Sequence, residues 1–166
     1  MPRLVFALIA MMACLLPLHA QAAQPVINDA DALKGQTHAK GVFLIDFTDP
    51  AKTAFYLEVI KGTHAGFVRQ KVEPDLVLVF IGPTVRFLTT EPHPDLALEQ
   101  GEHLEAIARH VRDLKALGVR MEACAVATEV FGVRNETILP EIKIIGDGFI
   151  SLIGYQGQGY KLVPLF

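Results

Sequence analysis

The sequence is poor in cysteine: its 166 residues contain only Cys14 and Cys124. Cys14 lies in an apolar amino-terminal segment that we expect to be removed, so the mature chain would keep one thiol. A single cysteine cannot form an internal disulfide. In an oxidising compartment, the thiol of Cys124 must therefore be buried, paired with another chain or used chemically.

The sequence also lacks the marks of several common classes of function. It has no basic cluster, which argues against nucleic acid as a partner. Its histidines and acidic residues show no recognised metal-ligand spacing. The glycine pairs at 146–148 and 157–159 lack the further glycine or lysine of a nucleotide loop and are typical of turns. We therefore expect no metal, no cofactor and no nucleic acid.

Residues 1–22 have the features of a secretory signal peptide. Arg3 gives a short basic start, residues 4–18 are almost wholly apolar, and the segment 20–22 offers small residues to a signal peptidase. We expect cleavage before Ala23, followed by export, most simply to a periplasm. Removing 22 residues from 166 leaves 144, and loss of Arg3 leaves 14 basic and 18 acidic residues, a net charge of −4.

This segment has two other interpretations. A membrane span is disfavoured because Pro17 and His19 interrupt an apolar run that is short for a bilayer, so we expect no membrane contact after cleavage. The alternative to a free exported protein is a lipid anchor through Cys14. A small residue precedes that cysteine, but the usual aliphatic residue three positions before it is missing.

The rest of the chain has the size and pattern of one domain. Residues 23–40 are polar without periodicity and are expected to form a flexible lead-in to a domain of residues 41–166. Apolar runs of strand length then alternate with helical segments, a pattern with crossovers long enough for parallel strands. It predicts a single three-layer α/β domain with a mainly parallel five-stranded sheet. Strands are expected near 42–47, 76–81, 119–124, 142–145 and 160–163.

The helices between these strands carry recognisable ends and faces. Asp49 is expected to cap a helix from Pro50 to about Arg69. Its apolar contacts are expected from Phe55, Val59, Ile60, Phe67 and Val68. The clearest helix covers 95–117 and ends at Gly118. Its buried face is expected to contain Leu104, Ile107, Ala108, Val111, Leu114 and Leu117. A shorter helix is expected over 149–155.

Cys124 is the leading candidate for chemistry. Its stretch reads as a strand turning into a short helix, which places the thiol at the sheet edge where ligands gather in open α/β folds. A helix amino terminus favours a thiolate. Glu122, on the same strand face, and Asp147, at another strand's end, are candidate crevice neighbours. A carboxylate at Glu122 would disfavour the thiolate but could accept a proton. The alternative is that Cys124 is only a small buried apolar side chain.

Several stretches together resemble the DsrE/DsrF-like family. They are residues 119–124, followed by Leu139-Pro140, 146–148 and 156–160, with 77–88 fitting the family's second strand and the segment after it. The resemblance covers about residues 40–166. It implies a flavodoxin-like fold that assembles into trimers or hexamers. It also implies that Cys124, at the matching position, carries persulfide sulfur between donor and acceptor proteins, here in an exported member.

The chemistry of a lone thiol agrees with that implication. A thiolate without a resolving cysteine in its own chain can hold a transferred sulfur and pass it to another thiol. The sequence therefore predicts a sulfur carrier or sulfurtransferase-like protein acting through Cys124. The alternative is a non-catalytic oligomeric binding or assembly module in which the cysteine is structural. A small-ligand site near Cys124 and Asp147 is a third interpretation that the sequence neither supports nor excludes.

Overall fold

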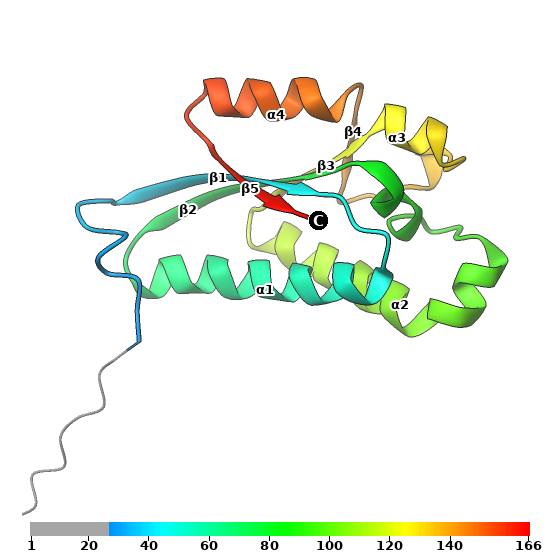
Figure 1. The fold of residues 1–166 in the computed structure, drawn as a ribbon. Coiled ribbons are helices and arrows are strands. Elements are labelled where there is room, and N and C mark those ends of the chain that lie inside the picture. The colour runs from blue at the N-terminus through cyan, green and yellow to red at the C-terminus, as the bar shows by residue number, and fades with distance from the viewer. Residues whose placement is uncertain (1–26) are drawn as a thin grey trace, which may run out of the picture.

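The strand-forming runs pair into one sheet in the computed structural model, which describes residues 27–166. All five strands are parallel, in the order β4-β3-β2-β1-β5 (Figure 1). The predicted signal peptide and Cys14 lie outside the described residues. The strands are β1 (His38–Ile45), β2 (Glu73–Phe80), β3 (Arg120–Cys124), β4 (Lys143–Ile145) and β5 (Lys161–Leu165).

Helices cover both faces of this sheet. Figure 1 shows α1 and α2 below it and α3 and α4 above it. The three-layer, flavodoxin-like α/β arrangement is therefore confirmed. Within residues 27–166, no helix combines the length and apolar character needed to cross a bilayer. The helices are α1 (Pro50–Arg69), α2 (Pro94–Ala116), α3 (Ala125–Val130) and α4 (Gly148–Gly157), with short 3-10 helices η1 (Gly82–Phe87) and η2 (Asn135–Thr137).

The central strands are apolar on both faces because each face has its own core. Leu78 and Phe80 of β2 face the cluster formed with α1 and α2, and both are fully buried. Val77 and Val79 alternate with them and pack with Leu152 of α4 on the opposite face. A continuous apolar run is what a strand covered on both sides requires.

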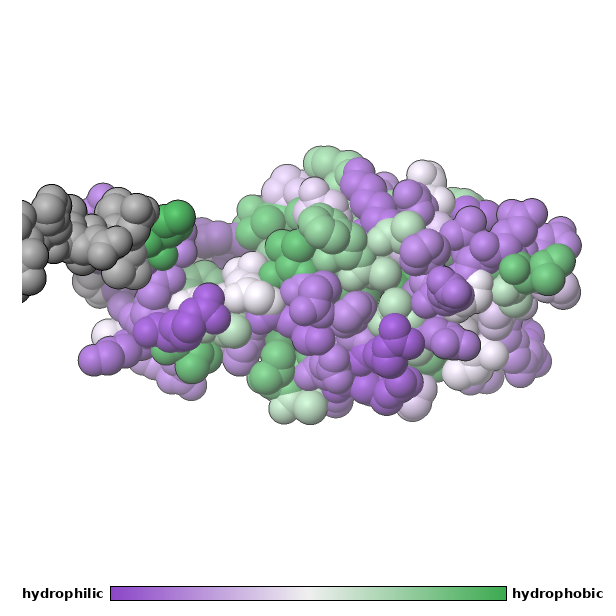
Figure 2. Space-filling model, turned by 90° about the horizontal axis from the view of Figure 1, so that it is seen from below, coloured by the Kyte–Doolittle hydropathy of each residue, from purple (hydrophilic) through white to green (hydrophobic). Residues whose placement is uncertain are grey.

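The buried face of α1 differs from the expected one. Asp49 caps the helix as predicted, accepting a hydrogen bond from the Ala51 N–H at 2.8 Å. Ile60 is buried, but Phe55, Val59 and Val68 are exposed, and Figure 2 shows hydrophobic surface on this side of the molecule. Apolar residues occur around much of α1, so their pattern alone does not select one face. The side chains that face the sheet and α2 are Thr53, Ala54, Leu57 and Ile60.

The start of the first strand and the buried face of α2 also need correction. β1 begins at His38 rather than at residue 42, and it pairs there with Glu73 of β2, so residues 38–40 belong to the sheet instead of the lead-in. The lead-in itself contacts the end of α1, where the Asp29 N–H donates to the Gln70 side chain at 2.9 Å. Of the buried face expected for α2, Ile107, Val111 and Leu114 are buried. Leu104 and Ala108 are only partly buried, and Leu117, just after the helix, is exposed.

Candidate functional site

Cys124 is the last residue of β3 and immediately precedes α3. The expected position at a strand-to-helix junction is therefore confirmed. The residue is only 6% exposed, and its thiol is free. It packs with Val85 and Ala127 in a small cluster at the carboxyl edge of the sheet. This edge is where open α/β sheets place their ligands.

The exposed part of Cys124 faces a pocket of about 360 Å³. The pocket is apolar except for two carboxylate residues, Asp46 and Asp147. Residues from α3, the turn after β2 and the start of α4 form its walls. Its lining consists of Asp46, Ile81, Gly82, Cys124, Val126, Ala127, Val130, Phe131, Asp147 and Phe149.

A backbone N–H points at the sulfur atom. The amide of Gly148, the first residue of α4, donates to Sγ of Cys124 at 3.2 Å. The sequence predicted that the thiol would face the helix that follows it, α3, but the observed donor belongs to α4. A hydrogen bond from an N–H group stabilises negative charge that develops on its acceptor, here the sulfur of Cys124.

Only glycine fits at position 148. A Cβ atom there would lie 2.5 Å from Cγ2 of Ile81 and 3.3 Å from Cβ of Cys124. Because Gly148 has no side chain, α4 can approach β3 closely. This close approach brings the Gly148 N–H within hydrogen-bonding distance of Sγ of Cys124. The glycine pair around Asp147 therefore does more than turn the chain.

The two carboxylates of the pocket lie at the ends of different strands. Asp147 caps α4, with Oδ1 accepting from the Phe149 N–H at 2.7 Å. The structure thus brings Asp147 into the pocket with Cys124. Asp46 directly follows β1 and was missed in the sequence analysis, although its place after a buried strand predicts this same edge. A Cβ atom on Gly82 would lie only 2.2 Å from Oδ1 of Asp46.

Glu122 does not line this pocket. It is 7% exposed beneath α4, where its carboxylate accepts hydrogen bonds from the hydroxyls of Ser151 and Tyr155, the latter at 2.8 Å. Burial, together with the hydrogen bond to the Glu122 carboxylate, raises the pKa of Tyr155 to about 12. Glu122 therefore joins β3 to α4 through hydrogen bonds and helps to fix the position of α4 next to Cys124.

An apolar surface, which we call the α3–α4 patch, borders the pocket. All of its members are large hydrophobic residues that are exposed to solvent on two neighbouring helix regions. Contiguous exposed apolar surface commonly marks an interaction site. The patch consists of Val126, Val130, Phe131, Phe149, Ile150 and Ile153.

The described part of the chain offers no group of three or more His, Cys, Asp or Glu residues that could hold a metal ion. The chemistry that residues 27–166 supply at this edge is therefore that of a thiol, an N–H donor and two carboxylates. The N–H donor favours a nucleophilic sulfur, whereas the two carboxylates oppose negative charge on it, and the pocket leaves room for a small reaction partner.

Solved structures with similar folds support the architecture. The protein of unknown function MTH1491 from Methanobacterium thermoautotrophicum superposes with a TM-score of 0.60 at 16% identity, covering 76% of this chain and 99% of that one. The ychN protein from E. coli gives 0.57 at 15% identity, with 76% and 99% covered. At these identities, the likeness shows the fold alone.

Comparison with curated proteins finds no match. A sequence model of the DsrE/DsrF-like family, in contrast, matches residues 40–165, which is most of the chain and nearly all of the described fold. The chain therefore belongs to the DsrE/DsrF-like family.

Proposed function

We propose that this protein carries sulfur as a persulfide on Cys124 and passes it to an acceptor thiol. The observation that supports this most is the position of Cys124, which lines an open pocket and whose Sγ accepts the Gly148 N–H at 3.2 Å. Membership of the DsrE/DsrF-like family points in the same direction. No other cysteine follows residue 22, so none is present to close a disulfide with Cys124 after signal cleavage.

The proposed chemistry is two successive exchanges at sulfur. The Cys124 thiolate attacks the outer sulfur of a persulfide or polysulfide donor. The donor's S–S bond breaks, and its electron pair leaves on the shortened donor. An acceptor thiolate then attacks the outer sulfur on Cys124, and the electron pair of that S–S bond restores the Cys124 thiolate. Each exchange is balanced and requires no external oxidant.

The alternative function is an assembly module with a structural cysteine. The low exposure of Cys124 favours it, because a free cysteine buried in apolar surroundings is often inert. The two functions differ in one property of the folded protein, which is whether reagents reach the thiol without unfolding.

Thiol labelling of the folded protein separates these functions. We expect a small neutral alkylating reagent, iodoacetamide, to modify Cys124 through the pocket at a rate that low urea concentrations do not change. A maleimide on a bulky dye serves as the control, because the pocket should exclude it until the protein unfolds. If Cys124 is structural, both reagents need global unfolding, which slows labelling by about 10³-fold or more and makes both rates rise steeply with urea.

The proposal includes assembly into a homo-oligomer, either a trimer or a hexamer. The α3–α4 patch supports it, because a second copy would cover exposed apolar side chains beside the pocket. Light scattering after size exclusion should give the mass of the assembly. Val130→Asp with Ile153→Asp should reduce that mass, whereas a wild-type protein that is monomeric at high concentration would exclude assembly.

We also propose that the protein works after export, with its signal peptide removed. The support is the pattern of residues 1–22 and the family match beginning only at residue 40. The mass of the exported protein should correspond to a chain starting at Ala23. A lipid-modified chain starting at Cys14 would establish the anchored alternative instead.

A further inference from the structure

A second and larger pocket lies next to the pocket of Cys124. It has a volume of about 680 Å³, within the range of small-molecule sites, and lies between the first turns of α2 and the segment after α3. Phe131 lines both pockets. Val133 also lines the larger one and packs against the cluster that contains Cys124. The two pockets therefore share a wall.

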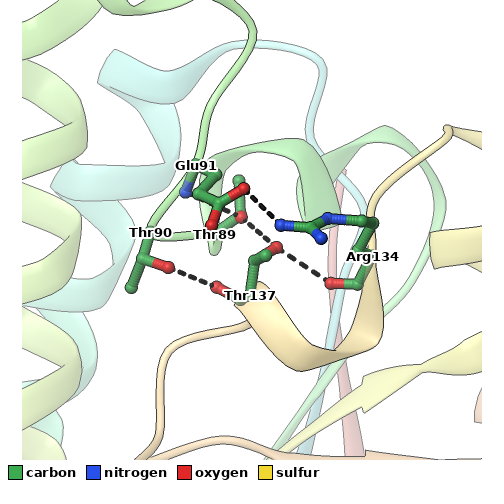
Figure 3. A network of polar contacts seen from close by, with 5 residues as sticks. All are labelled: Thr89, Thr90, Glu91, Arg134 and Thr137. Carbon is green, nitrogen blue, oxygen red and sulfur yellow. Dashed lines mark hydrogen bonds and ion pairs between the residues drawn. The ribbon is translucent and has the colours of Figure 1, made fainter.

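Polar contacts fix one side of the larger pocket. They join residues 89–91 to residues 134–137, two segments that are distant in sequence. Figure 3 shows the side chains that join them. The hydroxyls of Thr89 and Thr137 lie 2.6 Å apart, and Thr90 donates through its N–H to the Thr137 carbonyl at 2.7 Å. Glu91 and Arg134 form an ion pair across the same junction. These contacts fix the shape of the pocket on this side.

The charged side chains of this pocket are not all paired. Glu91 is bonded to Arg134, and His93 lies 3.6 Å from Asp95. Within residues 27–166, Arg86 and Glu99 form no ion pair with each other or with any other residue, yet both line the pocket. Among the described residues, the pocket therefore offers one cation outside any ion pair, Arg86. It also offers two carboxylates without a permanent cationic partner, Glu99 and Asp95, because His93 is charged only when protonated.

The free cation lies at the wall shared by the two pockets. The guanidinium carbon of Arg86 is 5.8 Å from the ring centroid of Phe131 and 5.6 Å from that of Phe87. Its Nε donates to the Pro83 carbonyl at 3.4 Å. These contacts hold the guanidinium beside Phe131 and leave its terminal nitrogens for a ligand, and a guanidinium binds a carboxylate through two parallel hydrogen bonds.

We infer that this pocket binds a low-molecular-weight thiol that carries both a carboxylate and an ammonium group, such as a cysteine-containing small peptide. Its carboxylate pairs with Arg86, its ammonium group with Glu99, and its sulfur reaches past Phe131 to Cys124. The inference deepens the proposed function by naming the class of acceptor. In the step itself, the ligand thiolate attacks the outer sulfur of the Cys124 persulfide and leaves as a persulfide, while the electron pair of the broken S–S bond returns to Cys124.

Binding is tested first, with a probe that cannot react. S-methylglutathione has both charges but no free thiol, and isothermal titration of the wild-type protein should show saturable binding. Arg86→Gln and Glu99→Gln should each weaken it about tenfold, as expected for loss of a hydrogen bond to a charged group. The matched controls, Arg112→Gln and Glu105→Gln, change exposed charges of α2 outside the pocket and should bind like the wild type. No saturable binding, or equal affinity in all five proteins, would overturn the inference.

Transfer is tested second, on protein loaded with inorganic polysulfide. At equal thiolate concentration, glutathione should remove the sulfur from Cys124 faster than the neutral thiol 2-mercaptoethanol. The ratio of the two rates should fall about tenfold in Arg86→Gln. If Cys124 never loads, the proposed function fails, while the binding test still decides on the pocket. If Cys124 loads but the two thiols react alike in wild type and variant, the inference about the acceptor is wrong and the carrier function is retained.

Discussion

Gly82→Ala is expected to destabilise the protein by about 2–5 kcal/mol. Gly82 has a φ of +54°, in the left-handed region that costs other residues about 1–2 kcal/mol. The added Cβ would also lie 2.2 Å from Oδ1 of Asp46, and relieving such overpacking typically costs about 1–3 kcal/mol. Urea unfolding, followed by circular dichroism, measures the loss.

Gly132→Ala is the matched control for this prediction. Gly132 has a φ of +65°, but a Cβ there meets nothing within 4 Å. It should therefore cost only the backbone contribution of about 1–2 kcal/mol. The difference between the two variants measures the contact with Asp46. Equal losses would mean that Asp46 moves away freely and that the wall of the pocket is not rigid at this point.

Gly148→Ala is expected to lower stability by about 1–3 kcal/mol and also to slow sulfur loading of Cys124. The new Cβ would lie 2.5 Å from Ile81 Cγ2 and 3.3 Å from Cβ of Cys124, so we expect α4 to shift away from β3. That movement lengthens the 3.2 Å contact between the Gly148 N–H and Sγ, so the sulfur loses its donor. The free energy of unfolding and the rate of loading from polysulfide are measured on the same preparation.

Gly154→Ala is the control in the same helix, and it is expected to raise the stability of the protein instead of lowering it. A Cβ at position 154 meets nothing within 4 Å, so alanine should stabilise α4 by about 1 kcal/mol through its higher helix propensity. Its loading rate should equal that of the wild type. If Gly148→Ala proves as stable as the wild type, the close approach of α4 to β3 is not a constraint. If it is destabilised but loads sulfur normally, the Gly148 N–H plays no part in the chemistry.

The order of elements could be predicted from the sequence, whereas the orientation of individual helix faces could not. Continuous apolar runs such as that of β2 indicate a strand covered on both sides whatever the details of packing. In α1, apolar residues surround much of the helix, and the choice of Leu57 rather than Phe55 depends on where α2 and the sheet lie. The positions of α2 and the sheet belong to the tertiary structure, so the local sequence pattern of α1 does not contain them.

For the candidate site, the position of Cys124 could be predicted from the sequence, whereas its neighbours could not. The place of Cys124 follows from a strand, a turn and a helix that are adjacent in sequence. Its hydrogen-bond donor, Gly148, comes from an element 24 residues later, and its neighbour Asp46 comes from another strand. Glu122 shares a strand face with Cys124, but α4 lies between it and the solvent. Contacts between distant elements decided these roles.

The mass of the protein after incubation with inorganic polysulfide tests the carrier function most directly. The wild-type protein should gain the mass of one sulfur atom, peptide mapping should place that sulfur on Cys124, and a reductant should remove it. Cys124→Ala should gain none. A wild-type protein that stays unmodified, or a Cys124→Ala variant that takes up as much sulfur as the wild type, would contradict the account.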